Sequence, residues 1–204
     1  LRGDHHPSVA NALVNQGAIR HEQGQYAEAE PFYRDALVIV RGWYGENHPE
    51  TAGVLTMLGR NLLYQERHDD AQAMLTEALA VQERVYGPVH PRVASALVDL
   101  ASLATVTGRL DESERHNERV VAIYRAVYPG GHSLIGIALA NLASVWMARQ
   151  EWPRAERGFR EALAAYEGTL PAGHLNVAIT RIKLGRTLLR QLRYAGAEQA
   201  PRAG

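Results

Sequence analysis

The stretch Gly45-Glu46-Asn47-His48-Pro49 returns 42 residues later as Gly87-Pro88-Val89-His90-Pro91. Its histidine marks the same interval through the whole chain, at His6, His48, His90, His132 and His174. A fixed interval of this length is typical of a protein built from one repeated supersecondary unit, which buries its apolar face only by stacking on its neighbours. The sequence therefore predicts a single repeat array over residues 1–204, with repeats at 7–48, 49–90, 91–132 and 133–174, a partial repeat at 175–204 and the tail of a preceding repeat at 1–6.

Each repeat is predicted to contain two amphipathic α-helices. In the first repeat, Pro7 suits a helix N-terminus because its missing N–H has no partner there, and the apolar spacing continues to about Glu22. Gly24 interrupts this spacing, and a second helix is expected from about Ala27 to Gly45, a residue that favours a left-handed helix stop. The later repeats carry similar stops at Gly87 and Gly130.

One position of the first helix is always small, and its occupants are Gly17, Gly59, Ala101, Ala143 and Gly185. Only a small side chain lets two helix axes approach to about 8–10 Å, so this position is expected to face the second helix. A fixed position of the second helix is bulky, at Tyr33, Leu75 and Phe159, but Asn117 replaces it in the third repeat. We therefore expect that second helix to bury less apolar surface, and Asn117→Leu to be stabilising if the position is internal.

The repeat pattern resembles tetratricopeptide repeats, and the 42-residue length with a terminal Gly-x-x-His-Pro segment resembles the long variant found in kinesin light chains. The pairs Ala29-Glu30 and Ala155-Glu156 agree with that pattern. The resemblance covers nearly the whole chain and implies an all-α fold, a right-handed superhelical solenoid of antiparallel helix pairs. It also implies that the first helices line a concave groove that holds peptide segments or partner proteins.

Helical geometry indicates which residues would face this groove. If Leu13 and Gly17 face the second helix, residues spaced by three and four positions, beginning at Asn11, form an adjacent stripe on the first helix. We call this surface the first-helix stripe. Its candidate peptide-binding residues in the five repeats are Asn11, Asn15, Arg60, Tyr64, Val98, Asp99, Asn141, Lys183, Arg186 and Arg190.

The first-helix stripe suggests two preferences for a ligand. The family resemblance implies that Asn15 and Asn141 contact the peptide backbone. Lys183, Arg186 and Arg190 should make the potential positive towards the C-terminal end of the stripe. An extended segment with acidic residues at that end is therefore the expected partner, with charge adding more to selectivity than to affinity.

Composition argues against several classes of function. The 22 basic and 22 acidic residues cancel, so no net charge attracts nucleic acid or an anionic membrane. The absence of cysteine fits a reducing, cytoplasmic location, and no apolar run approaches the roughly 18 residues of a membrane span. No Gly-x-Ser-x-Gly, phosphate-binding glycine loop or His-Glu-x-x-His occurs, so neither catalysis nor a cofactor is expected.

The five repeat histidines raise the question of a metal site. Successive repeats would place them on the order of 10 Å or more apart, whereas a metal ion needs its ligands at about 2 Å. One ion cannot collect them, so no metal site is predicted. Each ring is instead expected to pack between repeats or to bond a free backbone group at a helix start.

Two classes of function remain. The leading interpretation is a protein- or peptide-binding scaffold module that holds an extended segment in a concave groove. The alternative is a structural spacer or self-association module without a peptide ligand. Because the sequence opens inside a repeat and lacks an initiator methionine, we expect it to be an excerpt from a longer polypeptide.

Overall fold

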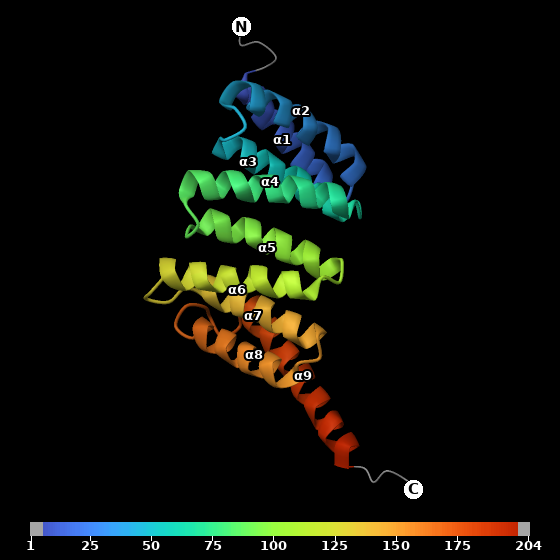
Figure 1. Ribbon diagram of the computed structural model, residues 1–204, viewed down its shortest axis with the longest axis vertical. Coiled ribbons are helices and arrows are strands. Elements are labelled where there is room, and N and C mark those ends of the chain that lie inside the picture. Colours follow the sequence, from blue (N-terminus) through green and yellow to red (C-terminus); the bar gives the residue numbers. More distant parts are fainter. Residues whose placement is uncertain (1–5, 200–204) are drawn as a thin grey trace. The chain divides into compact units, whose positions relative to one another are not determined.

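The computed structural model describes residues 6–199, and these residues form nine α-helices and no strand (Figure 1). The helices are α1 (Pro7–Glu22), α2 (Tyr26–Tyr44), α3 (Pro49–Tyr64), α4 (His68–Tyr86), α5 (Pro91–Val106), α6 (Leu110–Val127), α7 (Ser133–Ala148), α8 (Trp152–Tyr166) and α9 (Leu175–Gln199). Each full repeat contributes two helices, and the described part of the partial repeat forms α9. The all-α prediction and its helix order are confirmed for the described range.

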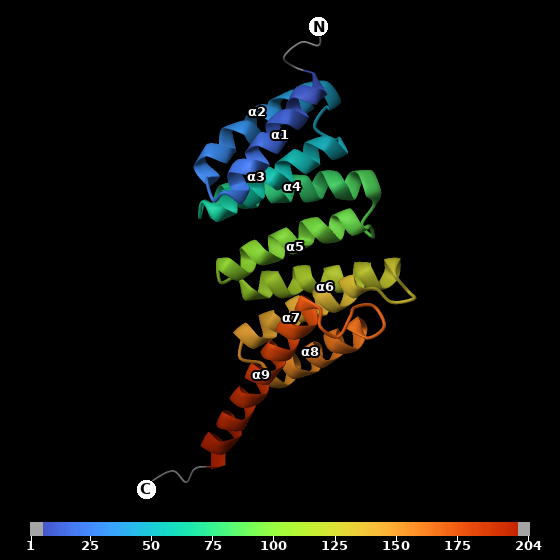
Figure 2. The ribbon, with the colours of Figure 1, turned by 180° about the vertical axis from the view of Figure 1, so that it is seen from behind.

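The chain divides into two compact units, which we call the N-terminal unit (residues 1–107) and the C-terminal unit (residues 108–204). In the N-terminal unit, α1 packs on α2 and α3 on α4, while α2–α3 and α4–α5 contacts join successive repeats. In the C-terminal unit, α6 packs on α7, α7 on α8 and α8 on α9. Figures 1 and 2 show the helices of a pair lying side by side, as in α1 with α2 and α7 with α8. The division lies in the turn between α5 and α6, inside the third repeat.

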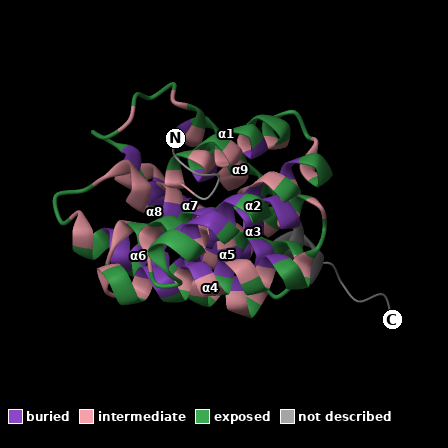
Figure 3. Cartoon of the chain, turned by 90° about the horizontal axis from the view of Figure 1, so that it is seen from above, coloured by how far each residue is buried: buried purple, intermediate pink, exposed green. Residues whose placement is uncertain are grey.

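The small position of the first helix faces the second helix, as predicted. A Cβ atom at Gly17 would lie 2.9 Å from a ring carbon of Tyr33, and one at Gly59 would lie 2.8 Å from Cγ of Leu75. Both contacts are too short for any side chain, so glycine sets the distance between the two helices. Figure 3 shows how burial varies along the helices, where buried positions in purple alternate with exposed positions in green.

Asn117 lies in the bulky position of α6 and is buried, so that position is internal. Its amide Nδ2 donates to the carbonyl oxygen of Ser113 at 2.9 Å and contacts the Ser113 hydroxyl at 3.3 Å. A buried amide needs such partners, because an unpaired one would cost free energy on folding. The polar residue therefore has partners within its own helix, and the effect of Asn117→Leu stays a prediction.

The turn from first to second helix has one residue with positive φ in every full repeat. The four residues are Gly24 (76°), Glu66 (60°), Gly108 (74°) and Gln150 (62°). The turn from second to first helix uses Gly45 (85°), Gly87 (77°) and Gly131 (91°). The prediction of Gly130 was wrong by one residue, because Pro129 occupies the place that matches Gly45 and its ring fixes a negative φ.

The repeat histidines cap the first helices. The Nδ1 atom of His48 accepts the N–H of Glu50 at 3.2 Å, and the ring stacks on Tyr44 with centroids 4.3 Å apart. The same backbone contact, at 3.1–3.2 Å, is made by His6, His90, His132 and His174. The expected structural role is confirmed. Across the described residues, no three histidine or acidic side chains gather closely enough to hold a metal ion.

A glutamate on the second helix links it to the next first helix. Glu30 accepts from Gln65 at 3.1 Å, and Glu156 accepts from Gln191 at 2.9 Å. Glu114 accepts from Trp146 at 2.8 Å and from Arg149 at 2.7 Å. Burial raises the pKa of Glu114, but these donors and nearby arginines outweigh burial and hold the pKa below its ordinary value.

Candidate functional site

The N-terminal unit contains a hollow of about 730 Å³ beside α3 and α5, which we call the α3/α5 hollow. It is lined by His21, Arg60, Leu63, Tyr64, Glu66, His68, Asp99, Ser102 and Val106. Arg60 and Ser102 hold the same position of consecutive first helices, and so do Tyr64 and Val106. The regular 42-residue spacing therefore brings the C-terminal halves of two first helices to one surface.

One wall of the hollow is aromatic. Tyr64 stacks on Tyr26 with ring centroids 5.0 Å apart, and the His21 ring meets both tyrosines edge-on at 5.0 Å. Tyr64 nevertheless keeps 59% of its surface exposed. Its neighbours hold the ring in place without covering it, so a ligand could contact a ring that is already oriented.

Hydrogen bonds fix the orientation of His21 in this wall. Nδ2 of Asn61 donates to the carbonyl oxygen of Tyr26 at 2.9 Å, which orients the buried amide. Its Oδ1 then lies 3.1 Å from Nδ1 of His21 and can only accept, so this ring nitrogen carries the proton. In the neutral ring, Nε2 of His21 is consequently an acceptor.

Arg60 and Asp99 form the polar part of the hollow. Nε and one terminal nitrogen of Arg60 donate to the two carboxylate oxygens of Asp99, at 2.8 and 2.9 Å. Side-chain exposure is 46% for Arg60 and 13% for Asp99, so the carboxylate is the inner partner. Burial raises the pKa of Asp99 above its ordinary value, although the guanidinium opposes this rise. Asp99 therefore orients Arg60.

The remaining candidates of the N-terminal unit lie outside the lining of the hollow. Asn11 and Asn15 are exposed on α1, and Val98 is half-buried on α5. Arg60, Tyr64 and Asp99 are thus the three predicted residues that the hollow brings together. Their role in binding a peptide stays a prediction.

The lining residues that were not among the sequence candidates include two histidines, His21 and His68. His21 stands where Leu63, Thr105 and Met147 stand in other repeats, so the repeat pattern gave no polar signal there. His68 is the first residue of α4, and its Nε2 atom is buried without a hydrogen-bond partner. The nearby tyrosines at 26 and 64 were the available signal, but only the structure shows that they stack around His21.

In the C-terminal unit, the first-helix stripe carries unpaired positive charge. Lys183 of α9 is half-buried, and its Nζ donates to the Ser144 hydroxyl of α7 at 2.8 Å. Burial lowers the pKa of Lys183. Among the described side chains, no carboxylate forms an ion pair with it. Asn141 is half-buried on α7, and Arg186 and Arg190 are exposed on α9.

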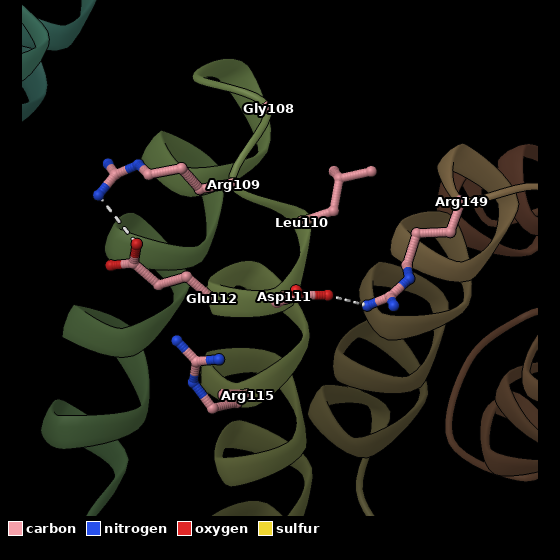
Figure 4. A pocket seen from close by; sticks show the side chains of 7 residues that line it. All are labelled: Gly108, Arg109, Leu110, Asp111, Glu112, Arg115 and Arg149. Carbon is pink, nitrogen blue, oxygen red and sulfur yellow. Dashed lines mark hydrogen bonds and ion pairs between the residues drawn. The ribbon is translucent and has the colours of Figure 1, made fainter.

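A second hollow, of about 600 Å³, lies at the start of α6 (Figure 4). Arg109 donates to Glu112 at 2.8 Å, and Arg149 donates to Asp111 at 2.5 Å. Figure 4 shows both pairs, and the Arg115 side chain lies beside them. Because acidic side chains of the lining already pair with two arginines, this surface is better explained as a structural charge network than as an anion site.

Comparison with known proteins places this geometry in a family. The sequence pattern of the tetratricopeptide repeat matches residues 8–84, 58–126 and 137–176. No curated protein matches the chain at a significant level. Among the described helices, none combines the length and apolar character that a membrane span needs.

Several solved structures share the fold. A kinesin light chain of Podosopora anserina with nearly identical TPR-like repeats has 20% identity and a TM-score of 0.80, covering 95% of this chain and 92% of that chain. BtubC (BKLC) from P. vanneervenii has 19% identity and a TM-score of 0.79, covering 98% and 86%. The apo form of RapI has 16% identity and a TM-score of 0.76, covering 92% and 66%.

These identities are low, so the structural likeness concerns the fold. The sequence pattern is independent of that likeness, and it covers more than half of the 204 residues. The chain therefore belongs to the tetratricopeptide repeat family.

Proposed function

We propose that the chain is a protein-binding scaffold module whose N-terminal unit holds an extended peptide segment in the α3/α5 hollow. The observation that carries this proposal is the exposed, stacked ring of Tyr64 beside the Arg60–Asp99 pair. Tyrosine and arginine dominate many interfaces, because tyrosine offers a large rigid contact area and the planar guanidinium of arginine offers several donors. An apolar side chain of the ligand would pack on Tyr64 and Val106.

The polar groups of the hollow suit a peptide backbone. Asp99 occupies Nε and one terminal nitrogen of Arg60, so the other terminal nitrogen can donate to a carbonyl oxygen of the ligand. Nε2 of neutral His21 can accept a peptide N–H. Donors and acceptors of both kinds are what an extended backbone needs when it is removed from water.

The C-terminal unit supports a preference for acidic residues. The Lys183 ammonium loses part of its hydration and gains only a hydroxyl partner. A carboxylate of the ligand would supply the missing negative charge, and Arg186 and Arg190 lie exposed on the same helix. We include Asn141 and Lys183 in this second contact surface and expect its contribution to weaken with salt.

The proposal includes a cytoplasmic location and no catalytic activity of the module itself. Self-association is the alternative function, and it makes a different prediction about mass. If the module were a spacer that pairs with itself, light scattering would show a mass that rises with protein concentration. A constant monomer mass together with peptide binding favours the scaffold.

The test begins with an extended-peptide library selected on the wild-type protein. Fluorescence anisotropy then compares the enriched peptides on Tyr64→Ala and on Val38→Ala, a control that removes an exposed apolar side chain from α2. We expect Tyr64→Ala to weaken binding about tenfold or more and the control to have little effect. Equal loss in both variants, or no enrichment of any peptide, would contradict the proposal.

A further inference from the structure

Lys183 is the only lysine of the sequence, which has 22 lysine and arginine residues in all. Arginine keeps its proton in proteins, whereas lysine loses its proton more readily when it is removed from water. A neutral lysine carries a nucleophilic lone pair. Amine chemistry on a side chain of this sequence can therefore take place at Lys183 alone.

The helices packed around Lys183 offer it no negative charge. Helix α7, which it contacts, contains no ionisable residue, and residues 175–197 of α9 include no acidic side chain. On α8, Glu156 and Glu161 already pair with arginines. Burial therefore lowers the pKa of Lys183, and no carboxylate among the described residues of these helices opposes that effect.

The hydroxyl of Ser144 holds the amine without using its lone pair. The Ser144 hydroxyl donates its hydrogen to the carbonyl oxygen of Ala140 at 2.7 Å. Its oxygen can therefore only accept from Nζ of Lys183, 2.8 Å away. In the neutral amine, one N–H makes this contact, and the lone pair stays available for a reaction.

The half-burial of Lys183 comes from packing against α7. Ser144 and Lys183 hold the same repeat positions as Arg60 and Asp99, the pair that joins successive first helices in the N-terminal unit. The side chain of Lys183 thus reaches back to the preceding first helix. Its surroundings are formed by described residues of the C-terminal unit.

Two exposed arginines lie on the same side of α9. Arg186 and Arg190 follow Lys183 by three and seven positions, and this spacing repeats on one side of a helix. Guanidinium groups suit phosphate, because their planar donors can make two parallel hydrogen bonds to it. A reagent that carries a phosphate group would therefore be held beside the amine.

We propose that Lys183 is a site of covalent acylation by acyl phosphates, such as acetyl phosphate. The neutral amine attacks the carbonyl carbon, and a C–N bond forms. The bond from this carbon to the phosphate oxygen breaks, and inorganic phosphate leaves with the bonding electrons. The nitrogen releases one proton to solvent, so the side chain becomes a neutral amide.

Acetylation would remove the positive charge that Lys183 gives to the first-helix stripe. The C-terminal unit would then lose much of its preference for acidic peptides. This consequence rests on the proposed function, whereas the acylation itself does not. Acylation and peptide binding can therefore be measured separately.

The first experiment incubates the full chain with acetyl phosphate at pH 7 and follows acetylation by intact mass and peptide mapping. The internal reference is Arg160→Lys, which adds a lysine at a position of α8 whose side chain is 60% exposed. We expect Lys183 to react about threefold or more faster than the added lysine, because a larger share of it is neutral at this pH. Equal rates, or a faster reaction at position 160, would overturn the proposal.

A second experiment tests the selection of a phosphate-bearing donor. Arg186→Gln combined with Arg190→Gln removes both guanidinium groups, and N-acetoxysuccinimide serves as an acyl donor without phosphate. The ratio of the acetyl phosphate rate to the N-acetoxysuccinimide rate at Lys183 should fall about threefold in the double variant. The ratio cancels any change in the reactivity of the amine itself. An unchanged ratio would overturn the assignment of acyl phosphates as the donor.

Fluorescence anisotropy on the acetylated chain tests the consequence for binding. Acidic and neutral peptides should bind the acetylated chain about equally at low salt, and a preference that survives acetylation would overturn this consequence. If no peptide binds the unmodified chain, the proposed function is contradicted and this consequence with it. The mass measurements still decide whether Lys183 is the acylation site.

Discussion

A cation on the first-helix stripe has a carboxylate partner in the N-terminal unit and a hydroxyl partner in the C-terminal unit. In the N-terminal unit, Arg60 meets a carboxylate in a bidentate pair with Asp99, beside an aromatic wall. In the C-terminal unit, Lys183 meets only the hydroxyl of Ser144. The surface around Arg60 and Asp99 is therefore neutral and lies beside oriented aromatic rings, whereas the surface around Lys183 is positive. The same repeat position can thus serve shape recognition in one place and charge recognition in another.

The helix positions themselves do not explain this difference. Asp99 and Lys183 occupy the same position of their repeats, as do Arg60 and Ser144. In the N-terminal unit the cation comes from the earlier helix and the anion from the later one. In the C-terminal unit the cation comes from the later helix and the earlier one supplies a hydroxyl. The repeat geometry determines which positions of successive first helices are in contact. The side chains at these positions determine whether the surface keeps a net charge.

The largest expected effect concerns the neutral pair. Arg60→Ala would leave the inner carboxylate of Asp99 without its partner, and we expect a loss of about 1–3 kcal/mol in unfolding free energy at pH 7. Arg160→Ala is the control, because Arg160 pairs with Glu156 on the surface of α8 and should contribute less than about 1 kcal/mol. Urea denaturation measures both.

The pH dependence of the Arg60→Ala loss provides its second test. Burial raises the pKa of Asp99 in the folded state above its unfolded value, and removing the guanidinium raises it further. The folded state then binds the proton more readily than the unfolded state, so acid relieves the penalty. The loss should be full at neutral pH and should shrink as the pH falls through the folded pKa towards the unfolded one. A loss independent of pH would mean that Asp99 does not depend on Arg60.

The next effect concerns the unpaired cation. Burial lowers the pKa of Lys183, so the folded state pays to keep the ammonium charged. Lys183→Met keeps an unbranched side chain, one atom shorter, and removes the charge, and we expect it to stabilise the chain by up to about 1 kcal/mol at pH 7. The gain should shrink as the pH rises through the folded pKa, because the wild-type lysine then becomes neutral as well.

A binding measurement connects this gain with function. Lys183→Met should reduce the preference for acidic over neutral peptides at low salt. Arg186→Met is the control for stability, because Arg186 is exposed on the same helix and its replacement should change the free energy of unfolding little. If Lys183→Met destabilises the chain, the hydrogen bond to Ser144 outweighs the cost of burying the charge. The two units would then differ in the geometry of their hydrogen bonds, and Lys183 would not provide a free charge for a ligand.

The fold was largely readable from the sequence because its signals repeat. The small residues at 17 and 59, the bulky residues at 33 and 75 and the repeat histidines each occur at the 42-residue interval, and a recurring signal is stronger than a single one. The site was less readable, because it depends on residues that differ between repeats. Arg60, Tyr64 and Asp99 were selected by helical spacing, but spacing alone cannot show that Arg60 and Asp99 pair or that His21 completes the aromatic wall.

The smallest expected effect concerns the turn from first to second helix, which has a residue with positive φ in both units. Glu66 in the N-terminal unit and Gln150 in the C-terminal unit have φ near 60°, at the place where Gly24 and Gly108 serve in the other repeats. A left-handed conformation costs a residue with a Cβ atom about 1 kcal/mol, while glycine loses more backbone entropy on folding. We therefore expect Glu66→Gly and Gln150→Gly to stabilise the chain by about 0.5 kcal/mol or less, and Gly24→Ala to destabilise it by about 1 kcal/mol.

Thermal or urea unfolding measures these changes in the free energy of unfolding, and the two glycine variants should agree with each other. Stabilisation by only one of them would show that its neighbours, such as the hollow beside Glu66, add strain that the backbone angle does not reveal.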